Sequence, residues 1–120
     1  MAERAALSGR FAVARSLALG LLQRDPNEFA ALMILTTAEI GLGNWDAAVN
    51  AGRRAFRATD LDMQRVNAAR LVASAHFRAG QHTRAELWLG RALTLAPDAG
   101  ASAALRQDFA KGRQIGRAHG

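Results

Sequence analysis

Apolar side chains recur every three or four residues along most of the chain, and short polar or glycine-containing segments interrupt this pattern. A period of three to four residues is typical of an amphipathic helix. The pattern therefore predicts an all-α protein, with a partial helix followed by six full helices. We expect these helices at residues 2–8, 10–23, 26–40, 45–58, 61–79, 82–95 and 97–111.

Three glycines mark an internal repeat. Gly9, Gly43 and Gly80 each follow a predicted helix, at spacings of 34 and 37 residues. The positions that recur at the same offsets are Phe11, Trp45 and His82; Ala14, Ala48 and Ala85; Leu22, Phe56 and Leu93; and Pro26, Asp60 and Pro97. Alanine lets two helices pack closely where a larger side chain would force them apart. The register thus predicts stacked helix pairs.

This register resembles the tetratricopeptide repeat (TPR) family, whose unit of 34 residues is a pair of antiparallel helices. The second half of the repeat occurs three times, as G-R-F-A-V-A-R-S-L-A-L-G-L-L-Q-R-D-P, G-N-W-D-A-A-V-N-A-G-R-R-A-F-R-A-T-D and G-Q-H-T-R-A-E-L-W-L-G-R-A-L-T-L-A-P. The first half departs from the family, because Leu32 and Ala69 replace its leading tryptophan and Glu39 and His76 its early tyrosine. The resemblance, to a bacterial member or a fragment of one, implies a short right-handed superhelix, a TPR-like α-solenoid. It also implies that the first helix of each pair lines a concave face.

The register defines a single TPR-like repeat domain over residues 1–113. Its parts are a partial unit at 1–26, two units at 27–60 and 61–97, and a capping helix at 97–111. The three extra residues of the second unit are close to one helical turn, so we expect them to lengthen its first helix at the start. The register is incomplete at both ends, which predicts a piece of a longer array or self-association. We interpret residues 114–120 as a disordered or non-native tail.

The segment Asp25-Pro26-Asn27-Glu28 combines a helix-capping aspartate, a proline and a glutamate three residues after the aspartate. This combination is typical of a capping box with proline at the first helical position. It predicts that a helix begins at Pro26.

The composition limits the function more than it defines it. The 120 residues include no cysteine, which excludes disulfides, thiolate metal sites and cysteine nucleophiles. The net charge is +6, and Lys111 is the only lysine among 16 basic residues. A basic surface favours acidic partners, although solvated helix faces explain most arginines equally well. The longest apolar run, residues 29–35, is too short to span a membrane, so we expect a soluble protein of the cytoplasm or the periplasm.

Catalytic chemistry finds little support in the sequence, and we expect no enzyme, cofactor or metal site. The three histidines lack the spacing of metal ligands and complete no catalytic triad. Gly41-Leu42-Gly43 follows a helix and lacks the lysine of a phosphate-binding loop. His82 and Trp45 occupy the ring position of the repeat, which predicts a packing role. Trp88 lies beside Leu89 on a helix, which favours packing against the terminal helix over a role as a contact residue.

The residues of each first helix that packing does not use form the candidate groove. Spacings of three and four place each set on one helical face. The set comprises Ala30, Met33, Thr37 and Ile40 of one helix, and Asn67, Arg70, Ser74, Phe77 and Arg78 of the next. Arg70 and Arg78 suit a carboxylate of a ligand, or are merely solvated. We expect Arg53, Arg54 and Arg57 to be exposed on the opposite, convex face.

These observations favour a scaffold that binds a protein or peptide segment, acidic in part, in the concave groove. Two alternatives remain open: a structural helical spacer of a larger envelope or secretion protein, and a basic surface that binds nucleic acid or another polyanion. Nucleic acid is the less favoured partner, because no arginine run is long enough to form a binding arm.

Overall fold

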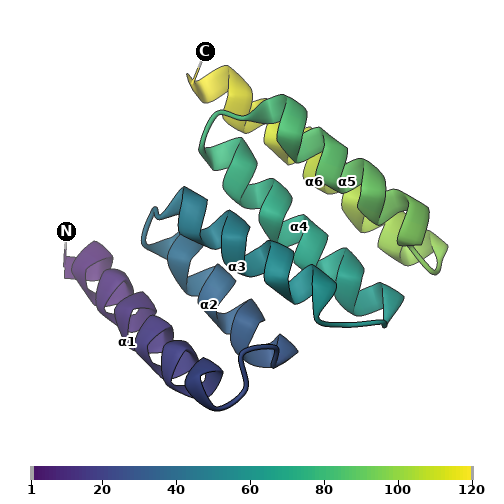
Figure 1. Cartoon of the computed structure of the whole chain (residues 1–120). Coiled ribbons are helices and arrows are strands. Elements are labelled where there is room, and N and C mark those ends of the chain that lie inside the picture. Colours follow the sequence, from purple (N-terminus) through teal and green to yellow (C-terminus); the bar gives the residue numbers. More distant parts are fainter. Residues whose placement is uncertain (1, 120) are drawn as a thin grey trace.

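The computed structural model describes the backbone of residues 2–119 and the side chains of residues 7–114. Six α-helices and no strand occupy this part of the chain (Figure 1). They are α1 (Ala2–Arg24), α2 (Phe29–Gly41), α3 (Trp45–Arg57), α4 (Asp62–Arg78), α5 (His82–Leu95) and α6 (Ala99–His119). The prediction of an all-α protein is therefore confirmed. Of the helices described, none is both long and apolar enough to cross a membrane.

The helices form two layers. Each helix packs against the next one in sequence, and in addition α2 contacts α4 and α4 contacts α6. Among the described residues, the backbones of α1, α3 and α5 do not approach one another in this way. Figure 1 shows the resulting row of antiparallel neighbours, in which α6 lies behind α5. Because only the even-numbered helices approach each other, the stack is tighter on their side, and this side is concave.

The α2–α3 and α4–α5 pairs repeat one another at an offset of 37 residues. Buried positions correspond one by one: Leu32 and Ala69, Leu35 and Val72, Thr36 and Ala73, Ala38 and Ala75, Glu39 and His76, Ala48 and Ala85, and Ala55 and Ala92. The turns correspond as well, since Gly43 and Gly80 have φ values of 77° and 79°. Their amides donate to the carbonyls of Ile40 and Phe77. A left-handed glycine after each first helix thus sets the same reversal twice.

Two hydrophobic clusters fill the space between the layers. One includes Ala18 and Leu22 of α1 and extends to α4, and the other extends from α4 to Leu105 of α6. Phe56 of α3 packs against both clusters and joins them. Most of the fully buried residues are alanine, so the helices approach each other closely with few large side chains between them.

Two predicted boundaries near the amino-terminal end are wrong. We expected a break at Gly9, but α1 is continuous, and Gly9 lies inside it without the positive φ of Gly43 and Gly80. A single glycine in a helix costs only about 1 kcal/mol relative to alanine, and no proline or turn residue adds to this cost. Gly9 therefore weakens the helix locally without ending it.

The second wrong boundary is the start of α2. This helix begins at Phe29, and its N-cap Glu28 makes no side-chain capping bond. The carboxylate of Asp25 instead accepts a hydrogen bond from the amide of Asn27, at 3.1 Å. Asp25 and Pro26 thus form a turn before the helix, and no capping box is present.

The longer first helix of the second unit is confirmed. Helix α2 begins 14 residues before Gly43, whereas α4 begins 18 residues before Gly80. The extra turn lies at the start of α4, where Arg65 lies over the ring of Phe56 of α3. The buried positions of the two pairs still correspond, so the core is not disturbed.

Helix α6 differs from its predicted range at both ends. It begins at Ala99, where the carboxylate of Asp98 accepts a hydrogen bond from the amide of Ala101 at 2.8 Å, and it continues to His119, beyond the predicted end at residue 111. The side chains of residues 115–120 lie outside the described part of the chain. The interpretation of residues 114–120 as a non-native tail therefore stays a prediction.

Candidate functional site

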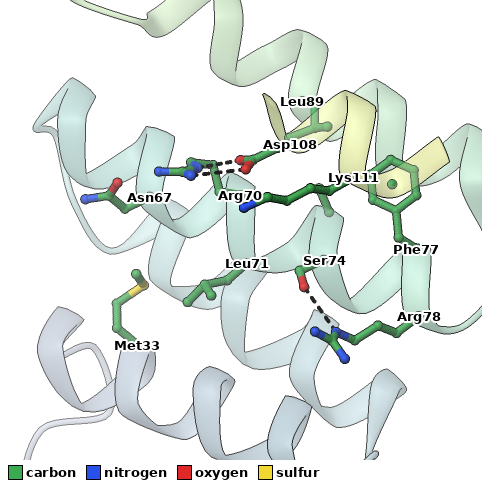
Figure 2. Close-up of a pocket in the computed structure, with 12 residues that line it drawn as sticks. Met33, Asn67, Arg70, Leu71, Ser74, Phe77, Arg78, Leu89, Asp108 and Lys111 are labelled. Carbon is green, nitrogen blue, oxygen red and sulfur yellow. Dashed lines mark hydrogen bonds and ion pairs between the residues drawn. The ribbon is translucent and has the colours of Figure 1, made fainter. Parts of the chain in front are cut away.

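A hollow of about 450 Å³ opens on the concave side, between α2, α4 and α6 (Figure 2). Six of the eight principal residues predicted for the groove line this hollow: Met33, Asn67, Arg70, Ser74, Phe77 and Arg78. The other two, Thr37 and Ile40, line an adjoining hollow that also includes Arg78 and Phe11. Ala30 is exposed on α2 and lines neither. The spacing of α2 and α4 residues thus brought the predicted set to one side of the molecule.

An aromatic ring closes one end of this concave hollow. The side chain of Phe77 is only 3% exposed, and its ring lies against the backbone of Gly112 on α6, where any Cβ atom would overlap the ring. The ring of His82 lies 5.5 Å from that of Phe77, at an angle of 52°. His82 therefore packs, as predicted, and together with Gly112 it fixes the position of Phe77.

Arg70 is paired within the protein. Its Nε and Nη2 atoms donate to Oδ2 and Oδ1 of Asp108 on α6, at 2.5 and 3.1 Å, in the parallel two-bond geometry that guanidinium and carboxylate groups favour. These hydrogen bonds raise the pKa of Arg70, against the opposing effect of its partial burial. The guanidinium therefore stays charged. The carboxylate that we expected from a ligand is supplied at this position by the protein itself.

Two other cations in the concave hollow have no carboxylate partner among the described residues. Arg78 approaches only the hydroxyl of Ser74, with an Nε to Oγ distance of 3.5 Å, at the outer limit of a hydrogen bond. Lys111 of α6 is exposed and takes part in none of the ion pairs of the described side chains. Figure 2 shows Lys111 and Arg78 on either side of Ser74, with Met33 and Leu71 farther along the groove. The hollow thus has an apolar part and a cationic part.

The contribution of α6 was missed by the sequence analysis. We treated this helix as a cap, yet it supplies Asp108, Lys111 and Gly112 to the hollow. A signal existed, because Leu105 is an apolar residue of that helix and residues three and seven positions later lie near the same helical face. Leu71 was also missed, although it lies four residues after Asn67 and three before Ser74, near the same helical face.

The arginines of the outer layer are only partly as predicted. Arg53 and Arg57 are exposed, but Arg54 is half-buried and donates from Nη2 to the carbonyl of Pro26, at 2.9 Å. The prediction that Arg54 is exposed is therefore wrong. This bond ties α3 to the turn that precedes α2, a contact across 28 residues that local patterns do not reveal.

The two tryptophans lie at partly exposed positions. Trp45 is half-buried at the edge of the hollow that includes Thr37 and Ile40, less covered than its predicted packing role implied. The ring of Trp88 meets that of Phe56 edge-on, with 5.4 Å between centroids. The ring of Trp88 thus contributes to packing between α3 and α5.

Nothing in the described part of the chain groups three histidine or acidic side chains in a way that could hold a metal ion. His76 is buried and shares a hydrogen bond between Nδ1 and Oε1 of Gln81, at 2.7 Å. A scan against models of known protein families and a search of curated proteins found no match to this chain. Its function is therefore inferred from the geometry of its surfaces.

Proposed function

We propose that this protein is a non-catalytic repeat module of the TPR type, and that it binds an extended segment of another protein in the concave groove of α2, α4 and α6. The observation that carries this proposal is the hollow of about 450 Å³ in which apolar side chains adjoin two cations, Arg78 and Lys111, without carboxylate partners among the described residues. A groove of mostly apolar lining with a few well-placed polar groups is typical of a binding site.

The lining defines the chemistry of the ligand. An apolar side chain of the bound segment would contact Met33, Leu71 and Phe77. A carboxylate, from an acidic residue or a chain terminus, would lie between Arg78 and Lys111 and accept charge-assisted hydrogen bonds. Arg70 has a different role, because its pair with Asp108 holds α6 beside α4. The groove is thereby ordered before the ligand arrives, which lowers the entropy lost on binding.

The internal repeat supports the TPR assignment. Two helix pairs share the same buried positions and the same glycine turn at an offset of 37 residues. The close approach of α2, α4 and α6 supports a concave face formed by the first helix of each pair. In such a stack the groove is the surface that can surround a partner on more than one side.

Selection from a display library of random peptides with free carboxyl termini tests this proposal. We expect enriched peptides to combine an apolar residue with a nearby carboxylate. In NMR titrations with such a peptide, the shifted resonances should belong to Leu71, Phe77 and Lys111. Enrichment of basic peptides, or of peptides without a shared apolar residue and carboxylate, would contradict the proposed ligand chemistry.

Matched variants locate the site. Replacing both Arg78 and Lys111 with glutamine should weaken binding of the selected peptide by about tenfold or more, because each substitution removes a charged hydrogen-bond donor. Replacing the exposed Arg57 and Arg106 with glutamine removes the same charge outside the groove and should leave affinity nearly unchanged. Equal losses in both double variants would show that general attraction to a basic protein, and not the groove, drives binding.

A further inference from the structure

Another hollow, of about 360 Å³, lies on the outer layer between α3 and α5, above α4. Its lining includes Arg53 of α3 and both Arg84 and Arg91 of α5, together with His76 and Trp88. None of these three arginines takes part in the ion pairs of the described residues, which involve Arg15, Arg65 and Arg70. We name this site the outer hollow. Three uncompensated positive charges around one hollow concentrate a potential that attracts anions.

His76 opens into the outer hollow. Its Nδ1 atom is engaged with Oε1 of Gln81 at 2.7 Å. No buried side-chain nitrogen or oxygen lacks a hydrogen-bond partner in the described part of the chain. Since no partner is found for Nε2, this atom is not fully enclosed, and the space that His76 lines is the outer hollow. Gln81 therefore holds one nitrogen of the ring, and the arginines line the same hollow as His76.

Trp88 orients one of the arginines. The guanidinium carbon of Arg91 lies over the indole ring, 4.8 Å from its centroid, and Trp88 is itself held edge-on by Phe56. A guanidinium stacked on an aromatic face keeps its N–H groups free to donate within the plane of the guanidinium. Arg91 is thus partly ordered without a carboxylate partner.

The equivalent position in the preceding repeat provides an internal comparison. Glu39 precedes His76 by 37 residues, and its neighbour Asn44 precedes Gln81 by the same number. The buried carboxylate of Glu39 accepts hydrogen bonds from Arg15 Nε at 3.0 Å and from Asn44 Nδ2 at 3.1 Å. In the first repeat, the carboxylate of Glu39 is therefore the anion that pairs with Arg15. In the second repeat a histidine replaces the carboxylate, while three arginines surround the space.

We propose that the outer hollow binds an oxyanion of the phosphate class. This anion would accept hydrogen bonds from Arg53, Arg84 and Arg91, as the carboxylate of Glu39 does from Arg15. The site lies on the layer opposite the peptide groove and does not depend on the function proposed for that groove.

The test is a titration of the whole chain with inorganic phosphate, against sodium chloride at equal ionic strength. NMR resonances of the His76 imidazole, the Gln81 side chain and the Trp88 indole should shift and reach saturation with phosphate alone. Replacing Arg84 and Arg91 with glutamine should weaken binding by about tenfold or more. The matched Arg57→Gln and Arg106→Gln double variant, outside the hollow, should bind phosphate as the wild type does. Circular dichroism verifies that both variants are folded.

Three results would overturn the proposal: no saturation with phosphate, equal weakening in the control variant, or shifts that map elsewhere. A second arm replaces phosphate with a short phosphoserine peptide. Tighter binding of this peptide would identify a phosphorylated protein as the source of the anion, and equal binding would identify free phosphate. The Arg78→Gln and Lys111→Gln double variant should bind phosphate normally, which separates this site from the groove.

Discussion

At the residue scale, the glycines of this chain differ in what they do. Gly43 and Gly80 have positive φ and end the first helix of each pair. Gly112 has no positive φ but leaves room for the ring of Phe77. Gly20 lies in α1 with no atom near the place where a Cβ would be. Only the surroundings distinguish these residues, so the same substitution should have opposite effects at different positions.

Replacing Gly80 with alanine should lower the free energy of unfolding by about 1 kcal/mol, because a left-handed backbone is costly for any residue with a Cβ. Gly20→Ala is the matched control, and we expect it to raise the free energy by about 0.5–1 kcal/mol, the helix propensity difference. Urea unfolding followed by circular dichroism measures both values. A neutral Gly80→Ala variant would contradict the backbone conformation of this turn.

The pair of Arg70 and Asp108 should show measurable coupling. A double-mutant cycle with Arg70→Gln and Asp108→Asn should give a coupling free energy of about 0.5–1.5 kcal/mol, since the pair is partly buried and makes two hydrogen bonds. The pKa of Arg70 is raised in the folded state, so the charged guanidinium stabilises the fold. This contribution is complete at every pH below the ordinary pKa of arginine and is lost only in strong alkali. Coupling should therefore be the same at pH 6 and pH 8 by urea unfolding. A coupling near zero would show that α6 does not depend on this contact.

At the element scale, the outer helices differ in what covers them. Ala55 of α3 and Ala92 of α5 are fully buried at equivalent positions, each within one of the two hydrophobic clusters. The corresponding residue of α1 is Leu21, which is 44% exposed, and Leu17 nearby is 65% exposed. Within the described chain, α1 packs against α2 alone. At this position, a small residue thus occurs where neighbouring helices cover it, and a large residue occurs where it is exposed.

A pair of substitutions tests this relation. Ala55→Leu should lower the free energy of unfolding by about 1–3 kcal/mol, because the larger side chain has no space between α2 and α3. Leu21→Ala should change it by about 0.5 kcal/mol or less, since the side chain is largely solvated. Thermal and urea unfolding give both values. Equal costs would show that the two positions are equally covered and would contradict the relation.

The sequence predicted helices α3 to α5 and the end of α2 well, because these boundaries depend on local chemistry. The glycine turns, the apolar periodicity and the recurring alanines are all local features of one helix pair. The extra turn of α4 follows from the longer spacing between Gly43 and Gly80. The break at Gly9 was wrong because glycine ends a helix only where the chain also turns. The bond from Arg54 to the carbonyl of Pro26 and the pair of Arg70 with Asp108 join residues 28 and 38 positions apart. Local patterns do not predict such contacts, so the part of the groove that α6 builds was not predicted.

At the scale of the whole molecule, the packing is one-dimensional. Among the described helices, each contacts its neighbours in sequence, and only the even-numbered helices also contact the next helix of their own layer. Stability in such an arrangement is close to a sum over helices and their interfaces. The central helices α3 and α4 have neighbours on both sides, whereas α1 and α6 have neighbours on one side.

Hydrogen exchange should show this gradient directly. Amides of α1 should exchange first through local opening, and those of α3 and α4 should be the most protected. Mass spectrometry of peptic fragments after exchange measures the order. Uniform protection along all six helices would indicate instead a single cooperative unit. Leu21→Ala should leave the order unchanged, whereas Ala55→Leu should lower the protection of α2 and α3 together.

The same neighbour-to-neighbour packing has a kinetic consequence. Nearly all helix contacts join segments close in sequence, and chains of this kind close short loops early and fold within microseconds to milliseconds. Folding can begin at either helix pair and spread outward one helix at a time. A chain emerging from the ribosome could therefore form its α2–α3 hairpin before α5 and α6 are synthesised.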